Sequence, residues 1–294
     1  MTPGAAAESS SRRTLAFAAL LAGAAAIAFA PIFVRLADTG PTASAFWRVA
    51  LSVAPLWLWV SVSPREPAGG PLPWKALVLA GLFFAADLGV WHLSIVYTSV
   101  ANSTLEANLA PIFVTLGAWL LWRARVTRLF LGALVLTLAG AILLVGPNVQ
   151  LGGRTLLGDA LGVLTAMFYA GYMLALKSAT GTASTARIMA INTSVAAVAL
   201  LPYALLTTDA MLPQGANGWL VLAALALIAQ VAGQSLIAFG FAHLPASFSS
   251  VSLLLQPVLA ALYAWAILGE GMGAVQMAGG AIVLAGIYLA RRGS

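Results

Sequence analysis

Long apolar runs, separated by short polar or proline-rich breaks, extend along the whole 294-residue chain. The first break contains Asp38, Gly40 and Pro41, and the longest, residues 63–73, contains four prolines. A helix needs about 20 apolar residues to cross the roughly 30 Å hydrocarbon core of a bilayer. The pattern therefore predicts an all-α membrane protein with ten membrane-spanning helices. We place them near residues 15–36, 43–62, 74–97, 102–122, 128–147, 156–177, 186–207, 217–241, 246–268 and 272–291.

The composition narrows the class of protein further. Only 7% of the residues are charged and 62% are hydrophobic, whereas a soluble domain carries roughly 25% charged residues. With no cysteine and two histidines, the chain lacks the thiolates and histidine clusters of common metal sites. It also lacks a Gly-x-x-x-x-Gly-Lys-Ser/Thr motif, so direct use of ATP is not expected. We predict no metal, no cofactor and no enzymatic activity.

Positive charges are distributed asymmetrically between the two sides of this topology. Arg35 and Arg154 lie on the side opposite the N-terminus, and Arg48 lies within the second span. We expect an inner-membrane protein, and the positive-inside rule then places both of its termini in the cytoplasm. The rule also explains the net charge of +6 without nucleic acid as a partner. Eleven basic residues lie on the N-terminal side: Arg12, Arg13, Arg65, Lys75, Arg123, Arg125, Arg128, Lys177, Arg187, Arg291 and Arg292.

The chain repeats itself at an offset of 140 to 146 residues: residues 42–44 recur as residues 182–184, and Pro111 recurs as Pro257. Each copy holds five spans, and an odd number makes the second copy enter the membrane from the other side. Two inverted copies that exchange slightly different conformations convert an outward-open cavity into an inward-open one. We predict a cytoplasmic tail at 1–14, a first five-helix repeat at 15–148 and an inverted second repeat at 156–292.

Two corresponding segments carry a resemblance to a known family. Ala101–Pro111 leads into Gly140, and the second copy runs from Ala246–Pro257 through Glu270 to Gly286. In these segments the chain resembles EamA-type members of the bacterial drug/metabolite transporter superfamily, and among them the YddG-like exporters of aromatic and other amino acids. The resemblance covers nearly the whole chain. It implies a ten-helix exporter whose cavity is lined by helices other than the fifth and tenth.

Polar side chains inside the spans indicate candidate sites, because a charge there costs about 2.5 to 3.5 kcal/mol or more. Asp87 lies near the middle of the third span, and Trp91 and Ser94 continue its helical face at spacings of four and three residues. This face suits the wall of a cavity, with a structural hydrogen bond from Asp87 to a neighbouring helix as the alternative. His92 is a further cavity candidate, with ordinary packing as its alternative.

Glu106 lies in the outer half of the fourth span. Three roles are open to its carboxylate: binding a substrate ammonium, exchanging protons, or pairing with Arg48 or Arg35 at a similar depth. We favour the ion pair, which can also act as a gate, because an unpaired carboxylate in lipid is costly. Proton coupling through Asp87 or Glu106 and facilitated efflux without coupling are both compatible with the sequence.

The second half offers neutral polar groups. Gln230 and Gln234 lie one turn apart near the middle of the eighth span, Gln256 lies in the ninth, and Tyr169 and Tyr172 lie in the sixth. Amides and hydroxyls can bind a zwitterion without a permanent charge in lipid. We predict that these residues line a cavity. The alternative is interhelical hydrogen bonding, worth about 0.6 kcal/mol per bond on average.

The fifth and tenth spans contain few polar side chains but carry glycines at spacings of eight and seven residues. Gly132 and Gly140 share one helical face, and Gly279 and Gly286 share another. Small residues in such positions let two membrane helices approach closely. We therefore expect these two spans to have a structural role.

Together these features predict a secondary transporter that exports small metabolites through a central cavity by alternating access. The resemblance specifies amino acids, aromatic ones included, as the substrates. Other metabolites or drugs are the alternative within the family. A channel, or an intramembrane enzyme using Asp87 and Glu106, belongs to a different class, and no hydrolase or metalloprotease motif supports the enzyme. One chain of ten spans in the bilayer suffices to enclose a site, so no protein partner is required.

Overall fold

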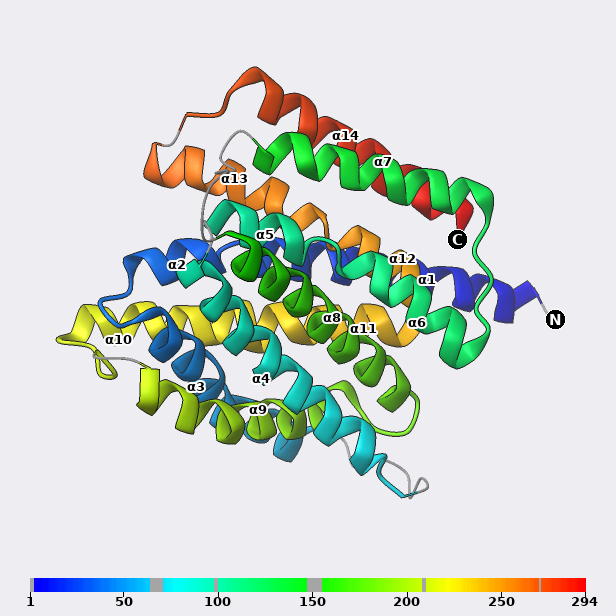
Figure 1. The fold of residues 1–294 in the computed structure, drawn as a ribbon. Coiled ribbons are helices and arrows are strands. Elements are labelled where there is room, and N and C mark those ends of the chain that lie inside the picture. Colours follow the sequence, from blue (N-terminus) through cyan, green and yellow to red (C-terminus); the bar gives the residue numbers. More distant parts are fainter. Residues whose placement is uncertain (1–2, 64–70, 98–99, 147–154, 208–209, 270) are drawn as a thin grey trace.

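The structure, a computed structural model, describes residues 3–63, 71–97, 100–146, 155–207, 210–269 and 271–294 (Figure 1). Within these ranges, ten helical segments are long and apolar enough to cross a membrane. The predicted all-α architecture with ten spans is therefore confirmed. The inverted orientation of the two copies and the cytoplasmic location of the termini stay predictions.

Most spans are single helices, but spans 1, 4, 8 and 9 consist of two or three segments each. The first half contains α1 (Pro3–Ile27), α2 (Ala30–Leu36), α3 (Pro41–Val62), α4 (Trp74–Tyr97), α5 (Val100–Ala107), α6 (Ala110–Trp122) and α7 (Arg128–Val145). The second half contains α8 (Thr155–Ala179), α9 (Thr185–Thr207), α10 (Ala216–Ala224), a π-helix (Leu225–Gln234), α11 (Ser235–His243), α12 (Ala246–Ser252), α13 (Leu255–Leu268) and α14 (Ala274–Gly293).

Three of these interruptions lie just before a proline. Pro31 and Pro111 occupy the second position of α2 and α6, and Pro257 occupies the third position of α13. Proline has no N–H group, and the first four N–H groups of a helix have no partner within that helix. A proline is therefore tolerated in the first turn, whereas the helix before it ends. The sequence predicted these spans without their internal breaks.

Helices from the two halves alternate in the bundle. The helix α7 packs along α14, α3 along α9, α4 along α8, and α1 along α11, and Figure 1 shows α7 and α14 side by side at one edge. In terms of spans, these pairs are 5 with 10, 2 with 7, 3 with 6, and 1 with 8. Exchanging the halves leaves this set of pairs unchanged, as a two-fold relation between two repeats requires.

Three of the four glycines singled out above bring α7 and α14 together. A Cβ atom at Gly140 would lie 2.7 Å from a backbone nitrogen of α14, and one at Gly279 would lie 2.5 Å from a backbone nitrogen of α7. A Cβ atom at Gly286 would collide with Thr137. Close packing is confirmed for these three positions. It is wrong for Gly132, where a Cβ atom would have no neighbour within 4 Å.

The outer surface of the bundle is apolar. Val135, Val198 and Leu206 are examples of large apolar side chains that are mostly exposed. A soluble protein rarely exposes contiguous apolar patches of this kind, but lipid tails cover them in a bilayer. The buried polar side chains described next therefore lie in the interior of a helix bundle whose outer surface is apolar.

Candidate functional site

A chain of hydrogen bonds crosses the middle of the bundle from the first half to the second. It begins at Arg48 on α3, which is only 9% exposed. The Arg48 Nε atom donates to the side-chain oxygen of Gln230 at 3.1 Å, and the Gln230 amide nitrogen donates to the Thr193 hydroxyl at 3.3 Å. Gln230 lies on the π-helix and Thr193 on α9. Three spans therefore meet at one buried cation.

Asp87 on α4 is the acidic group next to Arg48. The two side chains are close enough for their charges to interact, and both interact electrostatically with Tyr169 on α8. Opposite charges in a medium of low dielectric attract each other strongly, which offsets part of the cost of placing them in the membrane interior. Asp87 thus belongs to the central polar cluster.

Aromatic rings enclose this cluster on one side. The Arg48 guanidinium carbon lies 5.7 Å from the centre of the Phe84 ring, and the rings of Phe84 and Tyr172 are 4.9 Å apart at their centroids. The Tyr172 hydroxyl donates to the side-chain oxygen of Gln234 at 3.3 Å. Tyr172 and Gln234 are buried and bonded to each other, so in this conformation they form part of the wall between α8 and span 8.

The π-helix places both glutamines toward this centre. Such segments are rare and occur frequently at functional sites. The Ser52 hydroxyl of α3 lies 2.6 Å from the carbonyl oxygen of Arg48 and 3.1 Å from that of Ala226 in the π-helix. This contact fixes the segment carrying Gln230 against the segment carrying Arg48.

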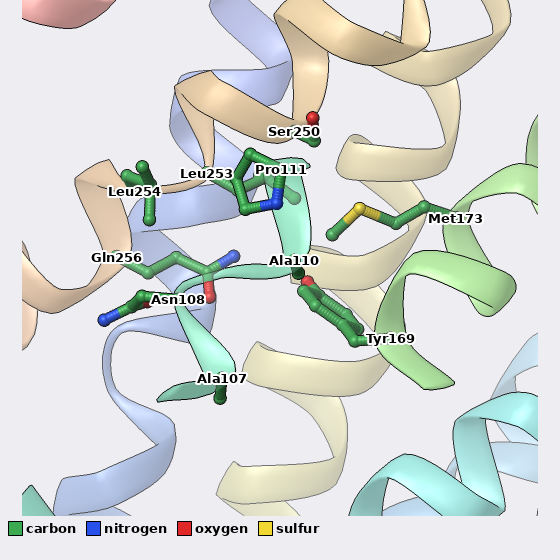
Figure 2. A pocket seen from close by; sticks show the side chains of 10 residues that line it. All are labelled: Ala107, Asn108, Ala110, Pro111, Tyr169, Met173, Ser250, Leu253, Leu254 and Gln256. Carbon is green, nitrogen blue, oxygen red and sulfur yellow. The ribbon is translucent and has the colours of Figure 1, made fainter. Parts of the chain in front are cut away.

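A small cavity lies beside the cluster, between the two broken spans 4 and 9 (Figure 2). Its volume is about 30 Å³, which is room for roughly two water molecules. Tyr169 lines the cavity, interacts electrostatically with Asp87 and Arg48, and is within hydrogen-bonding reach of Gln256. Tyr169 therefore connects the cavity to the charged pair, although neither Arg48 nor Asp87 lines the cavity. Its lining consists of Ala107, Asn108, Ala110, Pro111, Tyr169, Met173, Ser250, Leu253, Leu254 and Gln256.

Buried polar atoms without a hydrogen-bond partner concentrate on the same two spans. Almost all buried polar groups in proteins are paired, so each exception requires a reason such as a bound ligand, water or a second conformation. Outside spans 4 and 9, the described residues have two such atoms, in Thr165 and Ser235. Spans 4 and 9 contribute six: Ser103 Oγ, Glu106 Oε2, Asn108 Nδ2, Thr115 Oγ1, Ser249 Oγ and Gln256 Nε2.

The structure gives Glu106 an acidic neighbour where the sequence predicted an arginine. The charged group that acts on Glu106 is Asp159 of α8, and a Cβ atom at Gly162 of the same helix would collide with the Glu106 carboxylate. Arg48 has Asp87 as its acidic neighbour, and Arg35 lies exposed near the end of α2. Similar depth in the membrane was not enough to identify the partner, because depth does not say which way each helix face points.

The structure also separates the residues predicted along the third span. The Ser94 hydroxyl donates to the carbonyl oxygen of Gly158 at 2.8 Å, so it joins α4 to α8 instead of lining the cavity. Trp91 is partly buried on α4. The side chain of His92 and the whole of Glu270 lie outside the described residues.

Several residues of the site were not predicted from the sequence, and four of them carry polar or sulfur atoms at its centre or in the cavity wall. Asn108, Met173 and Ser250 line the cavity, and Thr193 bonds to Gln230. The signal that could have found Asn108 and Ser250 was the pair of prolines at corresponding positions of the repeat, because both residues lie in the interrupted spans. A proline-interrupted span in the same place of both halves indicates a binding site.

Comparisons with known proteins support this architecture. The model of the EamA-like transporter family matches residues 14–146 and again residues 156–292. The chain is 26% identical over 216 residues to the pseudopaline exporter CntI of Pseudomonas aeruginosa, covering 73% of this chain and 74% of that protein. An uncharacterized transporter of Archaeoglobus fulgidus is 27% identical over 220 residues, covering 75% of this chain and 77% of that protein.

A solved crystal structure has the same fold. Its TM-score to this chain is 0.78, and the match covers 96% of this chain and 98% of that one. The sequence identity is 18%, so the match concerns the arrangement of the helices alone.

Proposed function

Since the chain belongs to the EamA-like transporter family, we propose that it exports small polar metabolites, and specifically amino acids including aromatic ones, by alternating access. One observation carries this proposal: the buried cluster around Arg48 joins residues of both halves at the middle of the bundle. Ionisable side chains inside membrane spans are costly and commonly mark substrate or ion pathways.

The distribution of the cluster between the halves supports a transport cycle. Arg48 and Asp87 come from the first half, whereas Tyr172, Gln230 and Gln234 come from the second. Any movement of one half against the other changes the contacts of this cluster. A substrate bound there is therefore coupled to that movement, which is what alternating access requires.

The cavity between the broken spans supports the same cycle. At about 30 Å³ this cavity is far too small for an amino acid, so binding one there requires the cavity to enlarge. Opening requires spans 4 and 9 to separate, and both spans are interrupted where they border the cavity. The six unpartnered polar atoms on these spans gain partners when water or a substrate enters.

The experiment that tests the proposal measures uptake of radiolabelled phenylalanine and threonine into proteoliposomes containing the purified protein. We expect saturable uptake that unlabelled amino acid inside the vesicles accelerates, because a carrier exchanges substrate across the membrane and a channel does not. Uptake at symmetrical pH is compared with uptake under an imposed proton gradient, which separates facilitated from proton-coupled transport. Absence of uptake above protein-free liposomes for every amino acid tested would refute the substrate assignment.

Pseudopaline is a second candidate substrate for the same assay. The reason is the 26% identity to the pseudopaline exporter of Pseudomonas aeruginosa. We expect pseudopaline to inhibit phenylalanine uptake if the two compounds share the central site. If the protein transports pseudopaline but no amino acid, pseudopaline replaces amino acids as the proposed substrate, and the proposed alternating-access mechanism is unchanged.

A further inference from the structure

We propose that Arg48 and Asp87 form a recognition site for a zwitterion, in which Arg48 binds the carboxylate of the substrate and Asp87 binds its ammonium group. The inference rests on the proposed transport of amino acids and adds which side chains select that class. It follows from the juxtaposition of two opposite charges, a hydrogen-bonded support for one of them, and an adjoining cavity.

Arg48 is held in a fixed orientation. Gln230 accepts from its Nε atom, and Thr193 in turn holds the amide of Gln230. The Phe84 ring lies beside the guanidinium carbon at 5.7 Å. A guanidinium is planar and carries five N–H donors, so fixing it through Nε also fixes the direction of its remaining donors. The remaining donors form a planar fork of parallel N–H groups, which matches the two oxygens of a carboxylate.

Asp87 supplies the opposite charge from another helix. Its carboxylate interacts electrostatically with Arg48 and with Tyr169, and these three side chains come from α4, α3 and α8. An α-amino acid carries its ammonium and carboxylate groups on the same carbon atom. Neighbouring side chains of opposite charge are therefore complementary to it, whereas an amine or a carboxylic acid alone matches one of them only.

The cavity provides a place for the substrate side chain. Tyr169 borders both the charged pair and the cavity, Met173 lies one turn further along the same helix, and the walls from the broken spans include Pro111 and Leu253. Figure 2 shows Tyr169 and Met173 projecting from α8 toward the broken spans. Aromatic rings and methionine adapt to apolar groups of different shape. When spans 4 and 9 separate, the enlarged cavity suits aromatic and aliphatic side chains next to the charged pair.

The competing explanation is that Arg48 and Asp87 only stabilise the fold through their mutual attraction. The two explanations differ in the analogues that the protein distinguishes. Phenylalanine amide lacks the carboxylate, and 3-phenylpropionate lacks the ammonium group. We measure how strongly each compound inhibits exchange of radiolabelled phenylalanine in proteoliposomes. For wild-type protein we expect each analogue to inhibit about 10- to 100-fold more weakly than phenylalanine, as loss of one charge-assisted hydrogen bond predicts.

The variants assign each charge to one end of the substrate. Arg48→Gln is expected to lose the preference for phenylalanine over its amide and to keep the preference over 3-phenylpropionate. Asp87→Asn is expected to do the opposite. Lys75→Gln, at the exposed beginning of α4, is the matched control and should keep both preferences. Because each preference is a ratio within one variant, it does not depend on the amount of active protein.

A second measurement covers variants that do not transport. Ligand-induced increases in melting temperature of the detergent-purified protein report binding of the same three compounds, and Arg48→Lys replaces Arg48→Gln if the latter does not fold. Arg48→Lys keeps the charge but lacks the fork, so its preference for phenylalanine over the amide should fall by a smaller factor. Wild-type preferences in folded Arg48 and Asp87 variants would overturn the inference while leaving the proposed function intact. Absence of amino-acid exchange by the wild type would instead remove the proposed function.

Discussion

Spans 5 and 10 contrast with spans 4 and 9, although each pair occupies corresponding positions of the two halves. The helices α7 and α14 are uninterrupted and meet at glycines, and within the described residues neither has a buried polar side-chain atom without a partner. Spans 4 and 9 are both broken, border the cavity and carry six such atoms. The comparison supports the proposal that one pair fixes the two halves together and the other pair opens during transport.

The largest effect expected from this contrast concerns the glycine contact. Gly140→Ala should reduce the free energy of unfolding by about 2 to 3 kcal/mol, because its Cβ atom would lie 2.7 Å from backbone atoms that cannot move aside. The measurement is thermal denaturation of the purified protein in detergent. Gly132→Ala on the same helix is the control, and it should stabilise by up to about 1 kcal/mol through helix propensity. Equal stability of the two variants would contradict a tight α7 to α14 contact.

The second effect concerns opening of spans 4 and 9. Pro111→Ala and Pro257→Ala each restore an N–H donor at a break, which favours a continuous helix. Stabilising the closed conformation by about 1 kcal/mol slows opening about 5-fold, so we expect slower exchange of phenylalanine with unchanged or higher thermal stability. Pro55→Ala, inside α3 and away from the cavity, is the control for restoring a donor. If the variants at residues 111 and 257 transport as fast as wild type, the breaks are not hinges.

The third effect tests the correction at Glu106. Removing one member of a buried ion pair usually lowers the free energy of unfolding by about 3 to 5 kcal/mol. A decrease of this size is expected if Glu106 is paired with an arginine. Because its charged neighbour is Asp159, Glu106→Gln should leave the free energy of unfolding unchanged or raise it by up to about 1 kcal/mol. Chemical denaturation in detergent gives this difference. A decrease of about 3 kcal/mol in the free energy of unfolding would instead support the ion pair inferred from the sequence.

The outcome at Glu106 illustrates which structural features can be predicted from a sequence and which cannot. The ten spans could be predicted because every span must cross the same hydrocarbon thickness, and this requirement is visible in the apolar runs. The central position of Asp87 and Gln230 could be predicted from their depth, which is a distance along one helix. The partners of Arg48 and Glu106 depend on the rotation of several helices about their axes, and this rotation follows from packing between segments far apart in the chain. The broken spans lie between these cases, since Pro111 and Pro257 are visible in the sequence.

The smallest effect compares two threonines of adjacent spans. Thr137 on α7 donates to the carbonyl oxygen of Ala133 at 2.6 Å, whereas the buried hydroxyl of Thr115 on α6 has no partner. Thr137→Val should therefore destabilise by about 1 kcal/mol, and Thr115→Val should be neutral or stabilise by a similar amount, because it removes an unpaired polar group. Thermal denaturation measures both, and the identical change in volume makes each variant the control for the other.

If opening of span 4 hydrates the Thr115 hydroxyl, Thr115→Val also favours the closed conformation and slows exchange of phenylalanine. Thr137→Val lacks this effect. Equal behaviour of the two variants in both assays would remove the distinction between the pair of spans that is fixed and the pair that opens.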